Sequence, residues 1–155
     1  MTTIAAIKKV LLIEDNLMHQ KIASRAMQQE EINIDLSIIE NADKAILFLK
    51  SVISKKGFHY SELPDLILLD LKMPGKDGIE VLKMLKNEEK LKFIPTIILT
   101  SSELEKDVDD SYFFGANAYI LKPQNANDFI KMIKSITEFW FNFNILPSKS
   151  YSNFQ

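Results

Sequence analysis

The chain has 155 residues, of which 46% are hydrophobic and 26% charged, and its formal net charge is −2. This length suits one domain of the commonest size, and the composition is that of a folded globule, which excludes a disordered chain and a fibrous repeat. The nearly neutral charge argues against nucleic acid as the main ligand, because phosphate binding needs a concentrated basic surface. The chain has no Cys and only two His, His19 and His59, which excludes disulfides and thiolate metal sites and leaves little material for a His-built zinc site.

The apolar stretches are short, whereas a membrane-spanning helix needs about 20 residues. The N-terminal residues MTTIAAIKK contain no long apolar core behind a basic start, so no signal peptide is expected. We therefore expect a soluble, cytoplasmic protein with no membrane partner.

Five short apolar runs alternate along the chain with stretches of helical periodicity. The runs VLLIE, LSIIE, LILLD, TIILT and AYIL are continuous, which is typical of parallel strands buried on both faces. They predict strands at residues 10–14, 36–40, 66–70, 96–100 and 118–121. The amphipathic stretches that follow them predict helices at residues 17–29, 42–55, 78–87, 103–114 and 127–143.

This strict alternation of strand and helix predicts an α/β, doubly wound domain, with helices on both faces of a parallel sheet. We find no second domain, internal repeat or low-complexity linker. The predicted second helix has a suitable N-cap, Asn41, directly before it. Residues 56–64 (KGFHYSELP) are an insertion before the third strand, which we interpret as a solvated loop.

Polar and charged residues follow most of the predicted strands, at the edge of the sheet where such folds bind ligands. Glu14 and Asp15 end the first strand, Asp70 ends the third, Thr100 ends the fourth, and Lys122 follows the fifth. Three carboxylates, one hydroxyl and one ammonium group would therefore meet at one edge. A single acidic residue at a strand end is usually only a turn residue, whereas all five in this order indicate a site.

Such a site has the donors that a hard divalent cation prefers. Oxygen ligands without His or Cys suit Mg²⁺, and the three carboxylates, the lysine and one Mg²⁺ sum to zero charge. A phosphoryl group would then find the metal, the ammonium and the hydroxyl ready for its oxygens. This arrangement favours phosphoryl transfer with a carboxylate as acceptor.

On these residues the sequence resembles the response-regulator receiver domains of two-component signalling, over about residues 8–137. The resemblance rests on the motifs LLIEDN, LILLDLKMPGKDG, IILTSS and AYILKP, and on the spacings of thirty residues from Asp70 to Thr100 and twenty-two from Thr100 to Lys122. It implies a flavodoxin-like (βα)5 three-layer sandwich with strand order 2-1-3-4-5. The tail SITEFWFNFNILP further resembles a subgroup of stand-alone receivers that serve cyanobacterial-type phytochrome histidine kinases.

The resemblance also implies roles for individual residues. Asp70 would accept the phosphoryl group in a Mg²⁺-dependent phosphorelay from a histidine kinase. Asp15, Asp70 and the backbone carbonyl of Lys72 would bind the metal, Asp15 directly, and Glu14 would bind it through water. Lys122 would pair with the acceptor carboxylate and then with a phosphoryl oxygen.

Thr100 would bind another phosphoryl oxygen and report that the site is phosphorylated, and Tyr119 would swing inward when Thr100 moves. The Lys122–Pro123 bond is expected to be cis, and the glycines of the MPGKDG loop are expected to adopt positive φ. The Lys72 side chain would either shield the acyl phosphate or point to solvent. His19, in the first turn of the first helix, is interpreted as a surface histidine, and the alternative is a role in metal binding.

Other functions fit the residues less well. A phosphatase with an aspartate nucleophile needs a second acid two residues after it, where this chain has Lys72. An unphosphorylated receiver-like interaction module usually lacks an acidic residue or the lysine, and this chain keeps all of them. A flavin-binding domain would need a phosphate-cradling loop after the first strand, which residues 15–17 do not form. We therefore expect a phosphoacceptor signalling protein and not an enzyme with turnover.

The last feature is an aromatic C-terminal segment. We place the receiver domain at residues 1–143 and a tail, with no separate output domain, at residues 144–155. Output would then run through protein–protein contacts. The apolar residues expected to form an interface are Phe139, Phe141, Phe143, Ile145 and Leu146. Because so much aromatic surface usually marks an interface, we expect a two-fold homodimer through the fourth helix, fifth strand and fifth helix, and the alternative is a tail that folds back over its own domain.

Overall fold

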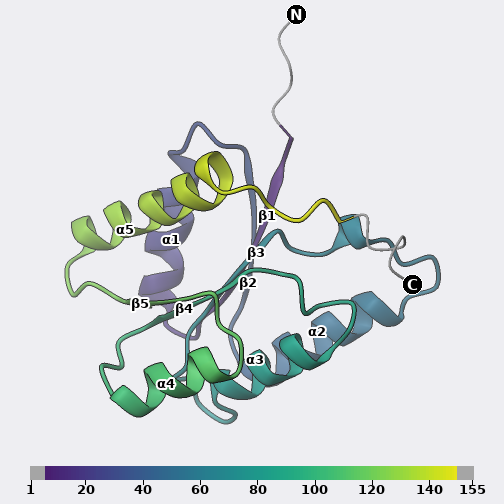
Figure 1. Cartoon of the computed structure of the whole chain (residues 1–155). Coiled ribbons are helices and arrows are strands. Elements are labelled where there is room, and N and C mark those ends of the chain that lie inside the picture. The colour runs from purple at the N-terminus through teal and green to yellow at the C-terminus, as the bar shows by residue number, and fades with distance from the viewer. Residues whose placement is uncertain (1–5, 150–155) are drawn as a thin grey trace, which may run out of the picture.

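The computed structural model describes residues 6–149, and residues 1–5 and 150–155, with parts of the predicted N-terminal segment and tail, lie outside the described range. Five parallel strands form one sheet in the order β2-β1-β3-β4-β5, which confirms the expected order. The strands are β1 (Lys8–Ile13), β2 (Ile34–Ile39), β3 (Leu66–Leu69), β4 (Thr96–Thr100) and β5 (Ala118–Leu121). Figure 1 shows this sheet between two layers of helices.

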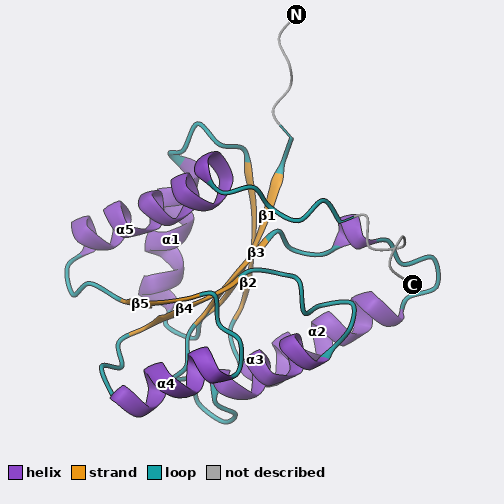
Figure 2. Cartoon of the chain, in the orientation of Figure 1, coloured by secondary structure: helices purple, strands orange, loops and turns teal. Residues whose placement is uncertain are grey.

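Each strand leads into a helix on one side of the sheet or the other. The helices are α1 (Leu17–Gln28), α2 (Ala42–Ser54), α3 (Gly78–Asn87), α4 (Glu105–Phe113) and α5 (Ala126–Glu138), the last of which follows β5. In Figure 2, α1 and α5 cover one face of the sheet, and α2, α3 and α4 cover the other. Four of these helices begin at a side chain that accepts a backbone N–H of the first turn, namely Asn16, Asn41, Asp77 and Asn125.

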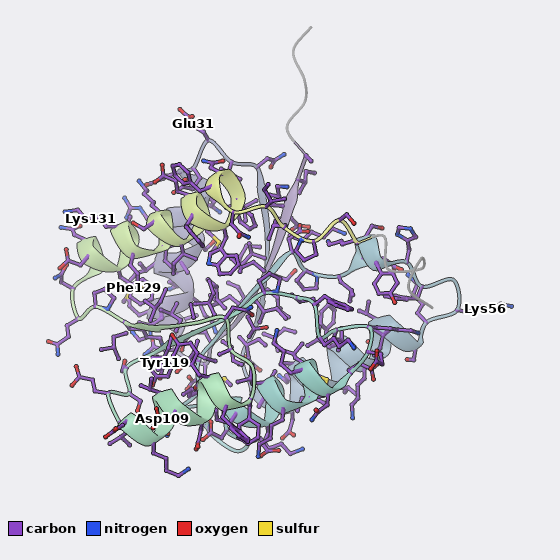
Figure 3. The ribbon with its side chains drawn as sticks, viewed as in Figure 1. Glu31, Lys56, Asp109, Tyr119, Phe129 and Lys131 are labelled. Carbon is purple, nitrogen blue, oxygen red and sulfur yellow. The ribbon has the colours of Figure 1, made fainter. Side chains whose placement is uncertain are left out.

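The core has two halves because alternate strand residues face opposite sides of the sheet. In β1, for example, Leu11 packs towards α2 and α3, whereas Leu12 packs towards α1 and α5. The apolar side of α5 faces this second half, since Phe129, Ile133 and Ile136 are buried against the sheet. Figure 3 shows Phe129 in the layer between α5 and the sheet.

The predicted bounds are wrong mainly where residues are polar. β1 and β2 each begin two residues earlier than predicted. Lys8 and Lys9 pair with Ile34 and Asp35 in the parallel ladder. Charged side chains interrupt the apolar pattern there, so the pattern alone placed the start of each strand too late. α4 is shorter than predicted and begins after Leu104, which makes no side-chain capping hydrogen bond. Among the described residues, no helix is long and apolar enough to cross a membrane.

The insertion at residues 56–64 is not the solvated loop that we expected. It contains a short 3-10 helix, Tyr60–Glu62, whose start is capped by His59. Phe58 and Tyr60 pack against the α2–α3 half of the core, and Leu63 is buried within it. The aromatic side chains therefore anchor the insertion to the domain.

The C-terminal segment follows a path that the helical pattern did not predict. α5 ends at Glu138, and a π-helical segment, Phe139–Phe143, continues it. The chain then crosses the face of the molecule towards the insertion (Figure 1), where Lys149 forms an ion pair of 2.7 Å with Asp65 and donates a hydrogen bond to the Leu63 carbonyl. At least this part of the tail therefore folds back over its own domain.

Candidate functional site

The carboxyl ends of β1, β3, β4 and β5 surround an open cavity of about 230 Å³. Every predicted metal ligand and the lysine line it. The lining residues are Glu14, Asp15, Asn16, His19, Asp70, Lys72, Ser101 and Lys122. The parallel sheet thus brings together residues that are up to 108 positions apart in the chain, as the sequence predicted.

Lys122 lies at the centre of this cluster. Its side chain is only 3% exposed, and its ammonium group forms ion pairs with Glu14 and, at 2.8 Å, with Asp70. A third neighbour, Nδ1 of His19, lies 3.1 Å from Lys122 Nζ. Because a buried charge is costly unless it is paired and hydrogen-bonded, these contacts are what allow an ammonium group to stay inside the domain.

Glu14 is almost completely buried, at 1% exposure. Burial raises its pKa to about 7, although hydrogen bonds from Lys122 and from the Asn16 amide oppose this shift. His19 is partly buried and lies 3.8 Å from Glu14, and burial followed by the charge of Lys122 lowers the pKa of its imidazole. The interpretation of His19 as a surface histidine is therefore wrong.

Glu14, Asp15 and Asp70 provide the donors for a metal ion. Each offers a carboxylate oxygen, and these oxygens lie within 4.8 Å of one another. Asp15 is exposed at the mouth of the cavity, whereas the other two are buried. Three oxygen donors with no soft ligand, at a site open on one side, fit a hard divalent cation that keeps some of its waters.

Thr100 and Tyr119 meet at one residue, Ser102. The hydroxyl of the fully buried Thr100 accepts a 3.4 Å hydrogen bond from the Ser102 amide, and Tyr119 donates a 2.8 Å hydrogen bond to the Ser102 carbonyl. Figure 3 shows Tyr119 beside α4, on the β5 edge of the sheet. The two residues that we predicted to be coupled are therefore joined by the β4–α4 loop.

The Lys72 side chain is 51% exposed, which fits the alternative that it points to solvent, although its ammonium group is also paired. Its ammonium group pairs with Asp107 of α4 at 3.1 Å, and Asp107 also accepts a hydrogen bond from the Ser102 hydroxyl. The Ser102 hydrogen bond and, more weakly, Lys72 lower the pKa of Asp107. This cluster links the loop after Asp70 to the start of α4. The sequence pattern does not mark Ser102 and Asp107 as site residues, because only the folded β4–α4 loop brings them to the site.

Two expectations about the backbone are wrong. The Lys122–Pro123 bond is trans, as are all peptide bonds in residues 6–149, and trans is the form that X–Pro bonds ordinarily prefer. In the MPGKDG loop Gly75 has a φ of +85°, but Gly78 does not have positive φ. Gly78 is needed for space instead, since a Cβ there would lie 2.2 Å from the Asp70 carbonyl oxygen.

Comparison with known proteins gives a consistent picture. Response regulator Rcp1 of Synechocystis sp. is 36% identical over 141 residues, which cover 91% of this chain and 94% of that protein. The crystal structure of the phosphorylated cyanobacterial phytochrome response regulator RcpA superposes with a TM-score of 0.84 at 34% identity, over 92% of this chain and all of that one. The Mn²⁺-bound form of Rcp1 gives a TM-score of 0.78 at 34% identity, over 91% of this chain and 99% of that chain.

The family assignment rests on more than these individual relatives. The model of the response regulator receiver domain matches residues 10–134, which include every acidic, hydroxyl and lysine residue of the site described above. The expected fold is present over the same residues. Of the five residues expected to converge, Glu14, Asp15, Asp70 and Lys122 line one cavity, whereas Thr100 is fully buried and does not line it. The chain therefore belongs to the response regulator receiver domain family, the signalling proteins of two-component systems.

Proposed function

We propose that this protein accepts a phosphoryl group on Asp70 from a histidine kinase and passes the signal on through protein contacts. The observation that carries the proposal is the 2.8 Å ion pair between the Asp70 carboxylate and the buried ammonium of Lys122. It fixes one carboxylate oxygen and places a positive charge where the transferred phosphoryl oxygens would lie. Such preorganised charge is the main source of catalysis in phosphoryl transfer.

The chemistry follows from the groups that line the cavity and from Thr100, which ends the neighbouring strand β4. A carboxylate oxygen of Asp70 forms the new bond to phosphorus, the bond between phosphorus and the donor imidazole breaks, and the imidazole leaves with that electron pair. Lys122 neutralises charge on the phosphoryl oxygens, and the hydroxyl of Thr100 can donate to one of them. Mg²⁺, held by Glu14, Asp15, Asp70 and the Lys72 carbonyl, would supply further charge neutralisation when bound.

Two features support phytochrome signalling as the setting. Rcp1 and RcpA, to which this chain is similar, are response regulators, and RcpA is described as a cyanobacterial phytochrome response regulator. The similarity extends over 91% of this chain and therefore beyond the residues that the receiver family model matches. We infer that the kinase is of the phytochrome type and that the protein works in the cytoplasm as a phosphoacceptor, without turnover of a substrate.

For the output we propose a homodimer through α4, β5 and α5. Large apolar side chains are exposed along this side, on α4, on β5 and after α5, among them Phe113, Leu121, Phe139 and Phe143. Of the residues that we predicted for the interface, Phe139, Phe143 and Ile145 are exposed, but Phe141 and Leu146 are partly buried against their own domain. The interface would therefore consist of the exposed residues only.

The test is mass measurement of the intact protein after incubation with Mg²⁺ and acetyl phosphate, a small phosphodonor. We expect one phosphoryl adduct in the wild type and none in Asp70→Asn. Asp35→Asn is the matched control, because Asp35 is an exposed carboxylate on the edge strand β2, away from the site. An adduct that persists in Asp70→Asn would refute Asp70 as the acceptor.

A further inference from the structure

The His19 side chain contacts Lys122 and Glu14, but none of the roles described above is assigned to it. An ammonium group carries three protons and needs three acceptors when it is buried. Lys122 has two carboxylates, those of Glu14 and Asp70, and its third acceptor in this structure is Nδ1 of His19, at 3.1 Å. Since Nδ1 accepts this hydrogen bond, it carries no proton here, and the imidazole is a neutral ligand of the ammonium.

The imidazole is held by one core side chain, and the backbone that carries it is held by a helix cap. Its ring stacks on Phe129 of α5, with 5.3 Å between ring centroids and 28° between ring planes. Its backbone amide donates to the side chain of Asn16, the N-cap of α1. Phe129 is 2% exposed, so the surface on which the ring rests is part of the core. The capped backbone and the stacked ring together limit where Nδ1 can point, which is what a positioning group requires.

A neutral third acceptor has a distinct consequence for the reaction. The carboxylates of Glu14 and Asp70 would also face the metal and the phosphoryl group, whereas Nδ1 has no such second task. His19 can therefore remain hydrogen-bonded to the Lys122 ammonium while the contacts of Lys122 with the two carboxylates change. It also adds no negative charge, which would repel an incoming phosphodonor.

We propose that His19 is a positioning residue that holds the Lys122 ammonium in place for phosphoryl transfer to Asp70. This inference rests on the proposed function for its kinetic consequence, but the contact between His19 and Lys122 stands independently of it. The stacking of His19 of α1 on Phe129 of α5 then also contributes to the reaction, because Phe129 orients the imidazole that positions Lys122.

Two substitutions separate the acceptor from the ring. His19→Phe keeps an aromatic ring to stack on Phe129 and removes the acceptor. His19→Asn removes the ring and places an amide oxygen close to the position of Nδ1. With acetyl phosphate and saturating Mg²⁺, we expect His19→Phe to lower the maximal phosphorylation rate about tenfold and His19→Asn to stay within about threefold of the wild type. Mg²⁺ affinity should be unchanged in both variants, since neither removes a metal ligand.

A second measurement needs neither metal nor phosphodonor. In the metal-free protein, the ¹⁵N NMR shift of His19 Nδ1 should be that of an unprotonated nitrogen that accepts a hydrogen bond, and it should move in Lys122→Met. If Nδ1 is protonated, or if its shift is the same in Lys122→Met, the contact is absent and the inference is wrong.

The outcomes distinguish this inference from the proposed function. If the wild type takes up no phosphoryl group, the proposed function fails, and the NMR measurement still decides the contact. If the wild type is phosphorylated and His19→Phe is phosphorylated at the same rate as the wild type, the positioning role is refuted. Equal slowing in both variants would also refute it, because an acceptor at this position would then not restore the rate.

Discussion

At the scale of single residues, the site is a balance of buried charge. Glu14, Asp15 and Asp70 carry up to three negative charges, and Lys122 is the one lysine whose ammonium lies among them in the described structure. Two carboxylates at 4 Å repel each other by about 4 kcal/mol near a protein surface. One lysine does not compensate the negative charge of three carboxylates. The remaining negative charge is the physical basis for expecting a divalent cation.

The first prediction concerns that cation. Asp15→Asn removes one charge and one oxygen ligand from the mouth of the cavity, so we expect Mg²⁺ to bind at least about tenfold more weakly. Competition with Mn²⁺, followed by electron paramagnetic resonance, measures this affinity. Asp35→Asn serves again as the control and should bind as the wild type does. Equal affinity in Asp15→Asn and the wild type would contradict the assignment of Asp15 as a ligand.

The second prediction concerns Gly78, the first residue of α3. A Cβ at this position would lie 2.2 Å from the Asp70 carbonyl oxygen and 2.9 Å from the Leu71 Cα. Both neighbours are backbone atoms, so the loop after β3 must move to admit even a methyl group. We expect Gly78→Ala to reduce the free energy of unfolding by about 1–3 kcal/mol, measured by urea denaturation, and to slow phosphorylation of Asp70.

Gly75 provides the contrast for that measurement. It has a φ of +85°, and a Cβ added there would meet no atom within 4 Å, so its surroundings leave room for a side chain. Because Asn tolerates the left-handed region, Gly75→Asn should change stability less than Gly78→Ala. If Gly78→Ala is as stable as the wild type, the close approach to Asp70 does not constrain the loop.

At the scale of elements, the sequence predicts what depends on local pattern. The runs at β3, β4 and β5 are fully apolar or nearly so, and their positions were predicted to within one residue. The charged start of β1 was missed because its residues owe their conformation to pairing with β2, which a local pattern does not contain. The same reason applies to the site. Strand ends predicted Asp70 and Lys122, but the contacts of Lys72 with Asp107 and of Tyr119 with Ser102 arise from how the loops pack.

The third prediction concerns the link between β4 and β5. Thr100 and Tyr119 both bond to Ser102, so a shift of Thr100 towards a phosphoryl group would alter the contact that holds Tyr119. We expect Thr100→Ala to accept a phosphoryl group but to transmit little change to α4 and β5. Amide chemical shifts of α4 and β5, with and without acetyl phosphate, measure the transmission.

Thr96 provides the matched control, because it lies at the other end of β4 and its hydroxyl bonds to the Ile94 carbonyl. Thr96→Val should transmit the change as the wild type does. A full response of α4 and β5 in Thr100→Ala would show that the signal takes another route.

The fourth prediction concerns the amino-terminal ends of β4 and β5, where Lys86 of α3 is held. Its ammonium group donates to the Ile94 carbonyl at 2.8 Å and lies within 3.4 Å of Lys92 and Asn117 oxygens. Burial lowers its pKa from 10.5 to about 8. Between pH 8 and 10.5 the unfolded chain therefore binds more protons at this residue than the folded one, and stability rises with pH over that window.

Comparison with Lys86→Met isolates this contribution, because other groups titrate equally in both proteins. We expect the free energy of unfolding of the wild type, relative to the variant, to increase from pH 8 to pH 10. Urea denaturation at several pH values measures it. A difference that stays constant or decreases would show that the three oxygen acceptors outweigh the burial of the charge.

At the scale of the whole molecule, the C-terminal segment divides into two parts with different surroundings. Lys149 is tied to Asp65 and Leu63, and Leu146 and Pro147 line a small pocket beside Pro95. By contrast, Phe139, Phe143 and Ile145 are 52%, 73% and 94% exposed. The segment thus covers its own domain at residues 146–149 and leaves aromatic surface uncovered where α5 ends.

Charge suggests how a second copy could meet that surface. On α4, Glu105 and Asp109 are exposed acidic residues and Asp110 is paired with Lys106, whereas Lys131 on α5 is an exposed basic residue. Figure 3 shows Asp109 and Lys131 at the outer surface on the same side of the molecule, on α4 and α5. A two-fold axis near β5 would set the acidic helix of one copy against the basic residue of the other, and the exposed Leu121 of β5 would lie between them.

The last prediction tests this dimer. The double variant Phe139→Ser and Phe143→Ser removes exposed aromatic surface but leaves Trp140 and Phe141, which pack against the core. Sedimentation equilibrium with and without acetyl phosphate should give a dimer for the wild type in at least one state and a monomer for the variant. Higher salt should weaken the dimer, because screening reduces the attraction between α4 and Lys131. Phe93→Ser, a change at an exposed phenylalanine beside the tail pocket, is the control and should dimerise normally. If the wild type is monomeric in both states at high micromolar concentration, the exposed aromatic residues serve another partner and the dimer is refuted.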